Sequence, residues 1–349
     1  MVYRRECVRA PDGGHFTLDW LHSAHGSEVA QAELPSTAPV VVLLSGIAGG
    51  SGDSYVKHFV AMAHAAGFRP VCFNGRGAAG GPLTTPQFYS ASFTADIRQA
   101  VALLADRFPG APLAAVGWSL GANILVNYMG EEGSACPLAA GVSLCNPFDL
   151  VMCDQALERG MGRIYSRAMG AGMRRLFAPH EALFRGGASR GFDAALASRA
   201  ATVRDFDEAI TRRCFGFPTV DAYYRASGSR YKLPAVAVPL LCVQARGGLG
   251  RRAPPGDGSA PSSPLLSPPG GGRPDRVDGG GAARGDRVER QGASGHHHHG
   301  GAPRVGHHAG RPFRGAVAVR PGARVLERGD GAATKRCTRG GARFCGHDG

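Results

Sequence analysis

The sequence lacks the features that would assign it to several common classes. No stretch approaches the roughly 18 consecutive apolar residues of a membrane-spanning helix, and the opening run MVYRRECVRAPDGG lacks the apolar core of a secretory signal peptide. We therefore expect a cytoplasmic protein by default; a segment upstream of residue 1 would instead allow a membrane or plastid location. The nine cysteines are odd in number and show no ligand spacing. We expect no disulfide, no metal and no cofactor.

The excess positive charge is concentrated in one part of the chain. The formal net charge is +13, but residues 1–245 contain 22 Lys and Arg against 19 Asp and Glu, whereas residues 246–349 contain 18 against 8. A nearly neutral first part is not typical of a nucleic-acid-binding domain. The basic part has only two aromatic residues, Phe313 and Phe344, so base stacking has little support. We expect no nucleic-acid partner.

Residues 246–349 differ abruptly in composition from the rest. Gly, Arg, Ala and Pro make up 66 of these 104 residues, with no sustained apolar periodicity. Such a segment buries too little apolar surface to offset its chain entropy, so we expect it to be disordered. Because codons of these four residues can consist wholly of G and C, an out-of-frame translation or gene-model error is an alternative origin. The expected domain is therefore 1–245.

Within 1–245, strands and helices alternate. Polar turn residues at 11–14 separate two strands of a hairpin, and unbroken apolar runs such as VVVLL are typical of strands buried on both faces of a parallel sheet. This alternation predicts an α/β fold with a mostly parallel sheet and flanking helices. The segment 149–233 reads as mainly helical and predicts a cap over the active-site end. The strands are expected at 5–10, 15–20, 40–44, 69–73, 112–117, 138–145 and 238–244, and the helices at 54–66, 93–108 and 120–130.

The run Gly117-Trp118-Ser119-Leu120-Gly121 is the strongest candidate for a catalytic motif. Gly-x-Ser-x-Gly occurs by chance in many chains, but here it lies between a buried-type strand and a helix. In that context the serine occupies a strained turn, the nucleophile elbow, and the glycines are needed because strand and helix approach closely. The alternative is a serine that only caps the helix. We identify Ser119 as the candidate nucleophile.

Serine attack on an ester creates an oxyanion, which needs hydrogen-bond donors. The amide of Leu120, directly after the serine, should be one donor. The loop SGIAGGSGD after the strand at 40–44 should supply the other, and the Ile47 amide is our candidate. A glycine-rich loop before a helix could alternatively bind phosphate, but the P-loop lysine and the Gly-x-Gly-x-x-Gly spacing are both missing.

Residues 1–245 resemble the α/β-hydrolase-domain proteins of the plant embryogenesis-associated branch, which is related to bacterial short-chain esterases and animal phospholipid or monoacylglycerol lipases. The resemblance rests on SGIAGGSGDSYVKHF, FNGRGAAGGPLTTPQFYSASFTADI, AVGWSLGANILVNYMGE, VSLCNPFDL and TVRDFDEAITRRCFGFPTVDAYY. It implies a serine carboxylic-ester hydrolase that acts on acyl lipids, for which peripheral membrane contact would be compatible. It also implies a Ser-Asp-His triad, with the Asp after VPLLCVQ and the His in a later Gly-Gly-His segment.

The sequence departs from the family pattern at the triad acid and base. Where the acid is expected, the chain reads Arg246-Gly247-Gly248-Leu249-Gly250, and no following strand, helix or Gly-Gly-His segment is present. Asp149 could serve as a substitute acid but is more plausible as a helix cap. We therefore expect impaired catalysis, or alternatively a non-catalytic binding protein with a basic tail. The histidines with no expected catalytic position are His15, His22, His25, His58, His64, His180, His296, His297, His298, His299, His307, His308 and His347.

Overall fold

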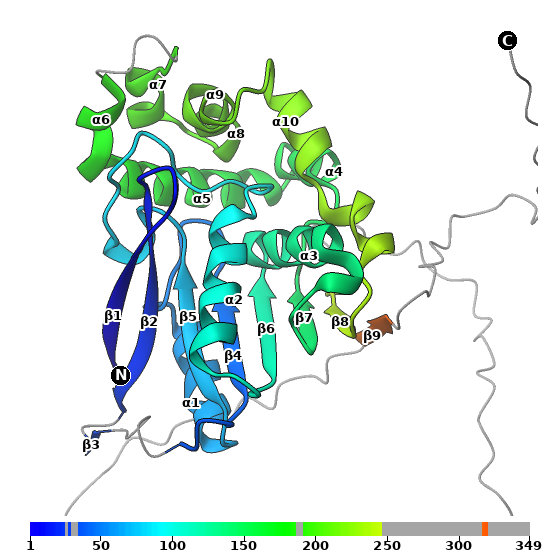
Figure 1. Cartoon of the computed structure of the whole chain (residues 1–349). Helices are drawn as coiled ribbons and strands as arrows, with labels where there is room; N and C mark the ends of the chain where they lie inside the picture. Colours follow the sequence, from blue (N-terminus) through cyan, green and yellow to red (C-terminus); the bar gives the residue numbers. More distant parts are fainter. Residues whose placement is uncertain (25–26, 29–33, 186–190, 246–315, 320–349) are drawn as a thin grey trace, which may run out of the picture. The chain divides into compact units, whose positions relative to one another are not determined.

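The computed structural model describes residues 1–24, 27–28, 34–185, 191–245 and 316–319 (Figure 1). They belong to one compact unit formed by Met1–Arg251 and Phe313–Gly349; a second unit, Arg252–Pro312, lies outside the described residues. The described residues form a nine-stranded sheet of order β1-β2-β5-β4-β6-β7-β8-β9, with β3 beside β2. The strands are β1 (Val2–Arg9), β2 (His15–Ala24), β3 (Ser27–Glu28), β4 (Val40–Leu44), β5 (Arg69–Asn74), β6 (Leu113–Trp118), β7 (Ala140–Leu144), β8 (Leu240–Val243) and β9 (Ala316–Val319).

The centre of the sheet is parallel and covered on both faces. Strands β5, β4, β6, β7 and β8 run parallel to one another, and β1 and β2 form the expected antiparallel hairpin. Along β4, alternate side chains point to opposite faces. Val40, Val42 and Leu44 join the core beneath α2 (Ala95–Arg107) and α3 (Leu120–Glu132). Val41 and Leu43 join the core beneath α1 (Ser54–Ala65). The predicted α/β class and mostly parallel sheet are confirmed.

The part of the sheet formed by β7 and β8 is less completely covered. Leu240 on β8 is 2% exposed, whereas its neighbour Leu241, which points to the opposite face, is 36% exposed. On β7, Val142 and Leu144 are likewise only partly buried. On the face of the sheet against which α1 packs, the described residues therefore leave these apolar side chains partly exposed to solvent.

The antiparallel strand β9 was not predicted from the sequence. It pairs with β8, with Leu240 opposite Val319 and Val243 opposite Ala316. Four alternating residues within a glycine- and arginine-rich stretch carry too little periodicity to indicate a strand, and an existing sheet edge supplies the missing hydrogen-bond partners. The expectation that the tail adds no strand was wrong at 316–319. The other calls on 246–349 concern residues outside those described.

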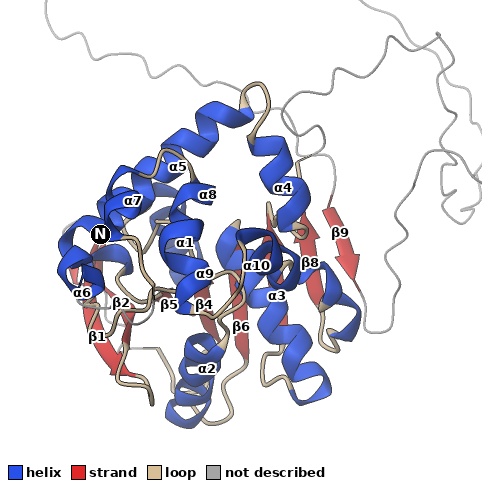
Figure 2. Cartoon of the chain, turned by 90° about the horizontal axis from the view of Figure 1, so that it is seen from above, coloured by secondary structure: helices blue, strands red, loops and turns tan. Residues whose placement is uncertain are grey.

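A layer of helices lies beyond the carboxyl ends of the parallel strands (Figures 1 and 2). Its aromatic core brings together Phe88, Phe177, Phe184 and Phe206, and the rings of Phe88 and Phe184 stack at 5.3 Å. We call this layer the cap; it occupies the range 149–233 that was expected to be mainly helical. Its helices are α4 (Leu150–Leu157), α5 (Gly162–Phe177), α6 (Glu181–Arg185), α7 (Ala194–Arg199), α8 (Val203–Phe206), the π-helix η6 (Asp207–Thr211), α9 (Arg212–Cys214) and α10 (Val220–Ser227).

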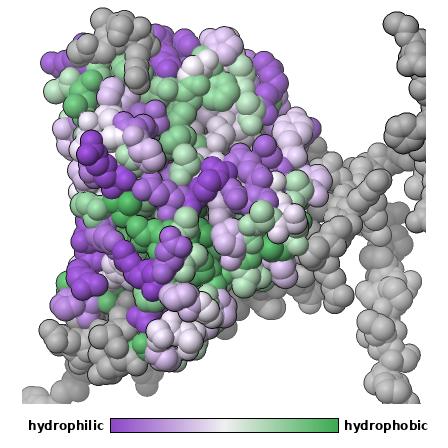
Figure 3. Space-filling model, in the orientation of Figure 1, coloured by the Kyte–Doolittle hydropathy of each residue, from purple (hydrophilic) through white to green (hydrophobic). Residues whose placement is uncertain are grey.

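Five short 3-10 turns complete the described secondary structure. They are η2 (Ala78–Gly80), η3 (Gly133–Ala135), η4 (Ala178–His180), η7 (Ser229–Tyr231) and η8 (Leu233–Ala235). On the side seen in Figure 3, polar and apolar side chains are mixed over the surface. Within the described ranges, no helix combines the length and apolar character needed to span a bilayer.

Candidate active site

Ser119 lies in a sharp turn between β6 and α3. Its backbone has φ 51° and ψ −117°, a region that residues with a side chain rarely occupy. Hydrogen bonds fix the turn on both sides: the Ser119 amide donates to the Leu144 carbonyl at 2.9 Å, and its carbonyl accepts from the Asn123 amide at 3.1 Å. The side chain is therefore presented at the carboxyl end of the sheet by a strained but anchored backbone.

The two glycines of the motif are required by close packing. A Cβ on Gly117 would lie 2.6 Å from the Ala122 backbone, and a Cβ on Gly121 would lie 2.3 Å from the Leu44 carbonyl oxygen. Both distances are shorter than real Cβ contacts, and the opposing atoms are backbone atoms that cannot rotate away. The crowding expected from the sequence is thus present, and it keeps α3 close to β4 and β6.

The loop after β4 packs directly against Ser119. A Cβ built on Gly46 would lie 3.4 Å from the Ser119 Cβ, and both Ile47 and Leu120 line the same cavity as Ser119. The structure therefore brings together all three site residues predicted from the sequence.

Two tyrosines hold this loop in place. The Gly46 amide donates to the Tyr55 hydroxyl at 3.0 Å, and the Ala48 amide donates to the Tyr89 hydroxyl at 2.8 Å. Burial raises the pKa of both tyrosines to about 12, so the hydroxyls stay protonated at neutral pH. Between these two anchored amides, the Ile47 amide has no hydrogen-bond partner among the described residues. The Leu120 amide opens a helix and has no carbonyl four residues earlier in that helix.

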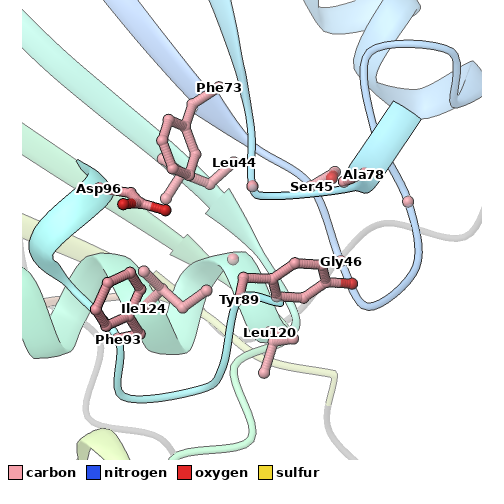
Figure 4. A pocket seen from close by; sticks show the side chains of 13 residues that line it. Leu44, Ser45, Gly46, Phe73, Ala78, Tyr89, Phe93, Asp96, Leu120 and Ile124 are labelled. Atoms are coloured by element: carbon pink, nitrogen blue, oxygen red, sulfur yellow. The ribbon is translucent and has the colours of Figure 1, made fainter. Parts of the chain in front are cut away.

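A small hollow lies beside the loop and shares Tyr89 and Leu120 with the lining of the main cavity. It has a volume of about 30 Å³, and Figure 4 shows Asp96 and Phe93 towards one end with Tyr89 and Leu120 towards the other. Asp96 is buried and bonded to the fully buried Arg76, with Nη2 and Oδ1 2.7 Å apart. Burial outweighs this partner and raises the pKa of Asp96. The pair ties α2 to the segment after β5.

The main cavity extends from Ser119 into the cap and measures about 490 Å³. Both the carboxyl ends of β6 and β7 and the cap helices contribute to its wall. The apolar share of that wall is contributed mainly by aliphatic, sulfur-containing and aromatic side chains: Ile47, Leu120, Leu150, Leu157, Met169, Met173, Val203, Tyr165, Tyr223 and Tyr224. Its size and lining suit an acyl chain.

One buried carboxyl group in the cavity wall was not singled out from the sequence. Asp207 begins the π-helix η6, and its Oδ2 accepts a hydrogen bond from the Tyr224 hydroxyl at 2.8 Å. Burial raises the pKa of Asp207 to about 6, against the opposing effect of its hydrogen bonds to Thr211 and Tyr224. Single turns of π-helix are frequent at functional sites. The residues were visible in the family segment TVRDFDEAI, but that pattern does not indicate which of the acids faces a cavity.

Charged side chains nearby are mutually paired. Arg204 bonds Asp154 at 2.6 Å and Asp221 at 2.7 Å, and both Arg204 and Asp154 line the cavity. Since two carboxylates share one guanidinium, the described residues of this wall offer no unpaired positive charge to attract an anionic substrate group. Among the described residues, no cluster of His, Cys, Asp or Glu is arranged to hold a metal ion.

Asp149, which the sequence offered as a helix cap and, less favoured, as a substitute acid, lies at the start of α4. The Asp149 carboxylate accepts from the Val151 and Met152 amides at 3.0 and 3.1 Å, and it also pairs with Arg230. The preferred interpretation of Asp149 as the N-cap of α4 is therefore confirmed.

No histidine is among the described residues that line the cavity with Ser119. His15 contacts the Thr84 hydroxyl at 2.8 Å, and the His180 ring lies against Phe88 at 6.0 Å between centroids. His58 and His64 lie on α1, and His22 lies on β2. The remaining histidines, and the segment 246–250 where the acid was expected, lie outside the described residues.

Comparison with known proteins agrees with this geometry. The family model described as the alpha/beta hydrolase fold matches residues 39–209. The chain belongs to the α/β-hydrolase fold family, as the resemblance predicted.

The relatives fall in the expected branch. The embryogenesis-associated protein EMB8 of Picea glauca is 48% identical over 69% of this chain and 53% of its own length. Phospholipase ABHD3 of Mus musculus is 32% identical over 70% and 58%, and a monoacylglycerol lipase of Saccharomyces cerevisiae is 28% identical over 70% and 62%. The chain thus spans between about half and three fifths of the length of these relatives.

Proposed function

We propose that this chain carries the nucleophile and oxyanion hole of a serine carboxylic-ester hydrolase acting on acyl lipids. The observation that carries the proposal is the convergence at one point of the strained Ser119, two amides free to donate, and a largely apolar cavity of about 490 Å³. The relatives named as a phospholipase and a monoacylglycerol lipase support the substrate class.

In the proposed reaction, the Ser119 Oγ attacks the ester carbonyl carbon. A C–O bond forms, the carbonyl electron pair moves to the oxygen, and the Ile47 and Leu120 amides donate to the resulting oxyanion. Collapse of this intermediate breaks the ester C–O bond, and the leaving oxygen takes up the proton that Ser119 gave up and departs as the alcohol. Attack of water on the acyl group then releases the acid and restores the Ser119 hydroxyl. Loss of one such donor typically lowers kcat by about 10²–10³.

The Ser119 proton must pass to a base before the hydroxyl becomes an effective nucleophile. Since no described histidine lines the cavity, we propose that this chain acylates slowly and turns over poorly. Arg204 is paired with two carboxylates, so the described cavity wall is neutral to acidic. Such a wall favours uncharged acyl esters over esters whose anionic group must enter the cavity.

The first prediction concerns labelling by an alkyl fluorophosphonate. The full chain should acquire the label slowly, and Ser119→Ala should remain unlabelled under the same conditions. Ser166→Ala is the matched control, since Ser166 is a buried serine in the same cavity wall on α5 and should label at the rate of the unchanged chain. Equal labelling of the unchanged chain and Ser119→Ala would contradict the proposal.

A non-catalytic acyl-lipid-binding protein is the second candidate, and it is favoured by the lack of a histidine among the described cavity residues. It predicts saturable binding of a fluorescent fatty acid without any labelling of Ser119. Displacement of that fatty acid by long-chain but not short-chain esters would place binding in the cavity.

A further inference from the structure

The outward face of α5 carries apolar side chains where a cap helix would ordinarily be polar. Gly162, Ser166, Gly170 and Met173 form its buried face. On the opposite side, Ile164 is 58% exposed and Tyr165 is 53% exposed, and Met161, one turn earlier, is 57% exposed. Their spacing of i, i+3 and i+4 places them together on one helical face.

Three arginines accompany these apolar residues: Arg163 and Arg167 lie one turn apart on α5, and Arg159 lies just before it. Arg159, Arg163 and Arg167 are all exposed, and none forms an ion pair within the described part of the chain. The acidic residue of this region is the exposed Glu158 at the end of α4. We call Met161, Ile164, Tyr165, Arg159, Arg163 and Arg167 the cap tip. Figure 2 shows α4 and α5 meeting at the rim of the cap, where this tip is located.

The excess positive charge of residues 1–245 lies in the segment from the end of α4 to η4, in which the cap tip supplies three of the five arginines. Residues 155–180 contain five Arg and one Glu, whereas the rest of 1–245 contains 17 Lys and Arg against 18 Asp and Glu. Without this segment, residues 1–245 would carry a formal charge of −1. A basic helix with exposed apolar side chains is typical of an element that lies in the interface of a membrane with anionic lipids.

The tip is continuous with the cavity. Tyr165 is both exposed and part of the cavity wall, and Leu157 and Met169 on the same two helices also line it. An acyl chain leaving a bilayer at the tip would therefore enter the cavity along apolar side chains.

We propose that the cap tip is a docking surface for an anionic lipid bilayer, which positions the cavity mouth against its surface. The proposal builds on the proposed function, because delivery of an acyl chain gives the contact its purpose. Membrane binding itself needs no catalysis, however, so the two proposals can be tested separately.

The test is co-sedimentation of the full chain with vesicles of phosphatidylcholine alone or with about 30% phosphatidylserine. Ser119→Ala serves as the background, so that hydrolysis cannot alter the vesicles. Replacing Arg159, Arg163 and Arg167 by Gln should lower the partition coefficient for anionic vesicles at least tenfold, since each arginine near such a surface contributes about fivefold. Replacing Arg4, Arg9 and Lys57 by Gln, which removes the same charge from exposed sites on β1 and α1, should change it by less than about twofold.

A second pair of variants tests the apolar part. Ile164→Ser should lower partitioning several-fold, whereas Met62→Ser on α1 should leave it unchanged, although both side chains are 58% exposed. Circular dichroism of each variant checks that the fold is retained. Equal losses for the tip and control variants would overturn the proposal, as would equal binding to both kinds of vesicle. Fluorophosphonate labelling of the tip variants carrying Ser119 reports separately on the proposed function.

Discussion

At the scale of single residues, Ser119 adopts a backbone conformation that opposes stability. A non-glycine residue with φ 51° and ψ −117° costs about 1–3 kcal/mol, because its Cβ crowds the adjacent peptide groups. Glycine has no Cβ and adopts positive φ readily. The site therefore retains a serine at the expense of folding stability, as expected where the side chain has a chemical role.

This strain predicts the outcome of a substitution. Ser119→Gly should raise the free energy of unfolding by about 1 kcal/mol relative to Ser119→Ala, while both remain unlabelled by a fluorophosphonate. In the interior of α5, Ser166→Gly should instead lower it by up to about 1 kcal/mol, because glycine is unfavourable in helices. Urea denaturation followed by tryptophan fluorescence measures both. A less stable Ser119→Gly than Ser119→Ala would contradict the strain.

Asp207 predicts a pH dependence of stability. Its pKa rises from 3.8 to about 6 on folding, because burial disfavours the carboxylate. In the unfolded chain the group ionises near pH 4, so its contribution to stability is complete below that pH and is lost as pH rises through about 6. Relative to Asp207→Asn, the free energy of unfolding of the unchanged chain should fall by on the order of 3 kcal/mol between pH 4 and 6.5 and change little at higher pH.

The hydrogen bond from Tyr224 provides a second variant for this test. Tyr224→Phe removes a donor to the carboxylate, raises the pKa of Asp207 further and should extend the loss to higher pH. The test is to measure the unfolding free energies of the unchanged chain, Asp207→Asn and Tyr224→Phe at the same series of pH values. A difference between the unchanged chain and Asp207→Asn that stays constant from pH 4 to 7 would exclude the buried, shifted carboxyl group.

At the scale of secondary-structure elements, β8 shows two environments on adjacent residues. Leu240 is 2% exposed and Leu241 is 36% exposed, on opposite faces of the sheet. Leu240→Ala should lower the free energy of unfolding by about 2–4 kcal/mol through the cavity it creates. Leu241→Ala should lower it by less than about 1 kcal/mol. Denaturant titration of the two variants tests this; equal losses would mean that something covers the Leu241 face in solution.

Elements with strong local signals could be predicted from the sequence. The apolar run VVVLL becomes β4. The run GWSLG spans the junction of β6 and α3, where only glycine tolerates the contacts at 117 and 121. The environment of Asp207 could not be predicted, because it depends on how η6 packs against Tyr224 of α10. Similarly, Arg204 and Asp154 are 50 residues apart and meet only in the folded cap. The short strand β9 requires the edge of β8 and has no signal of its own.

At the scale of the whole molecule, residues 1–245 combine the site at Ser119 with a cap that has a basic and partly apolar tip. Tyr55 and Tyr89 hold the loop at Ser119, while the cap tip carries three arginines that form no ion pair with any described residue. In the two proposals, Ser119 carries out the chemistry and the cap tip makes the lipid contact, and the wall of one cavity includes residues of both. This division predicts that tip variants alter vesicle binding without altering labelling of Ser119 in detergent-free solution.

The central claim is that Ser119 is a nucleophile facing the cavity, and mass spectrometry of the fluorophosphonate-treated full chain tests it most directly. The account predicts one adduct per chain, located on the peptide that contains Ser119, and its loss in Ser119→Ala but not in Ser166→Ala. An adduct on any other residue, or none after prolonged exposure, would contradict it.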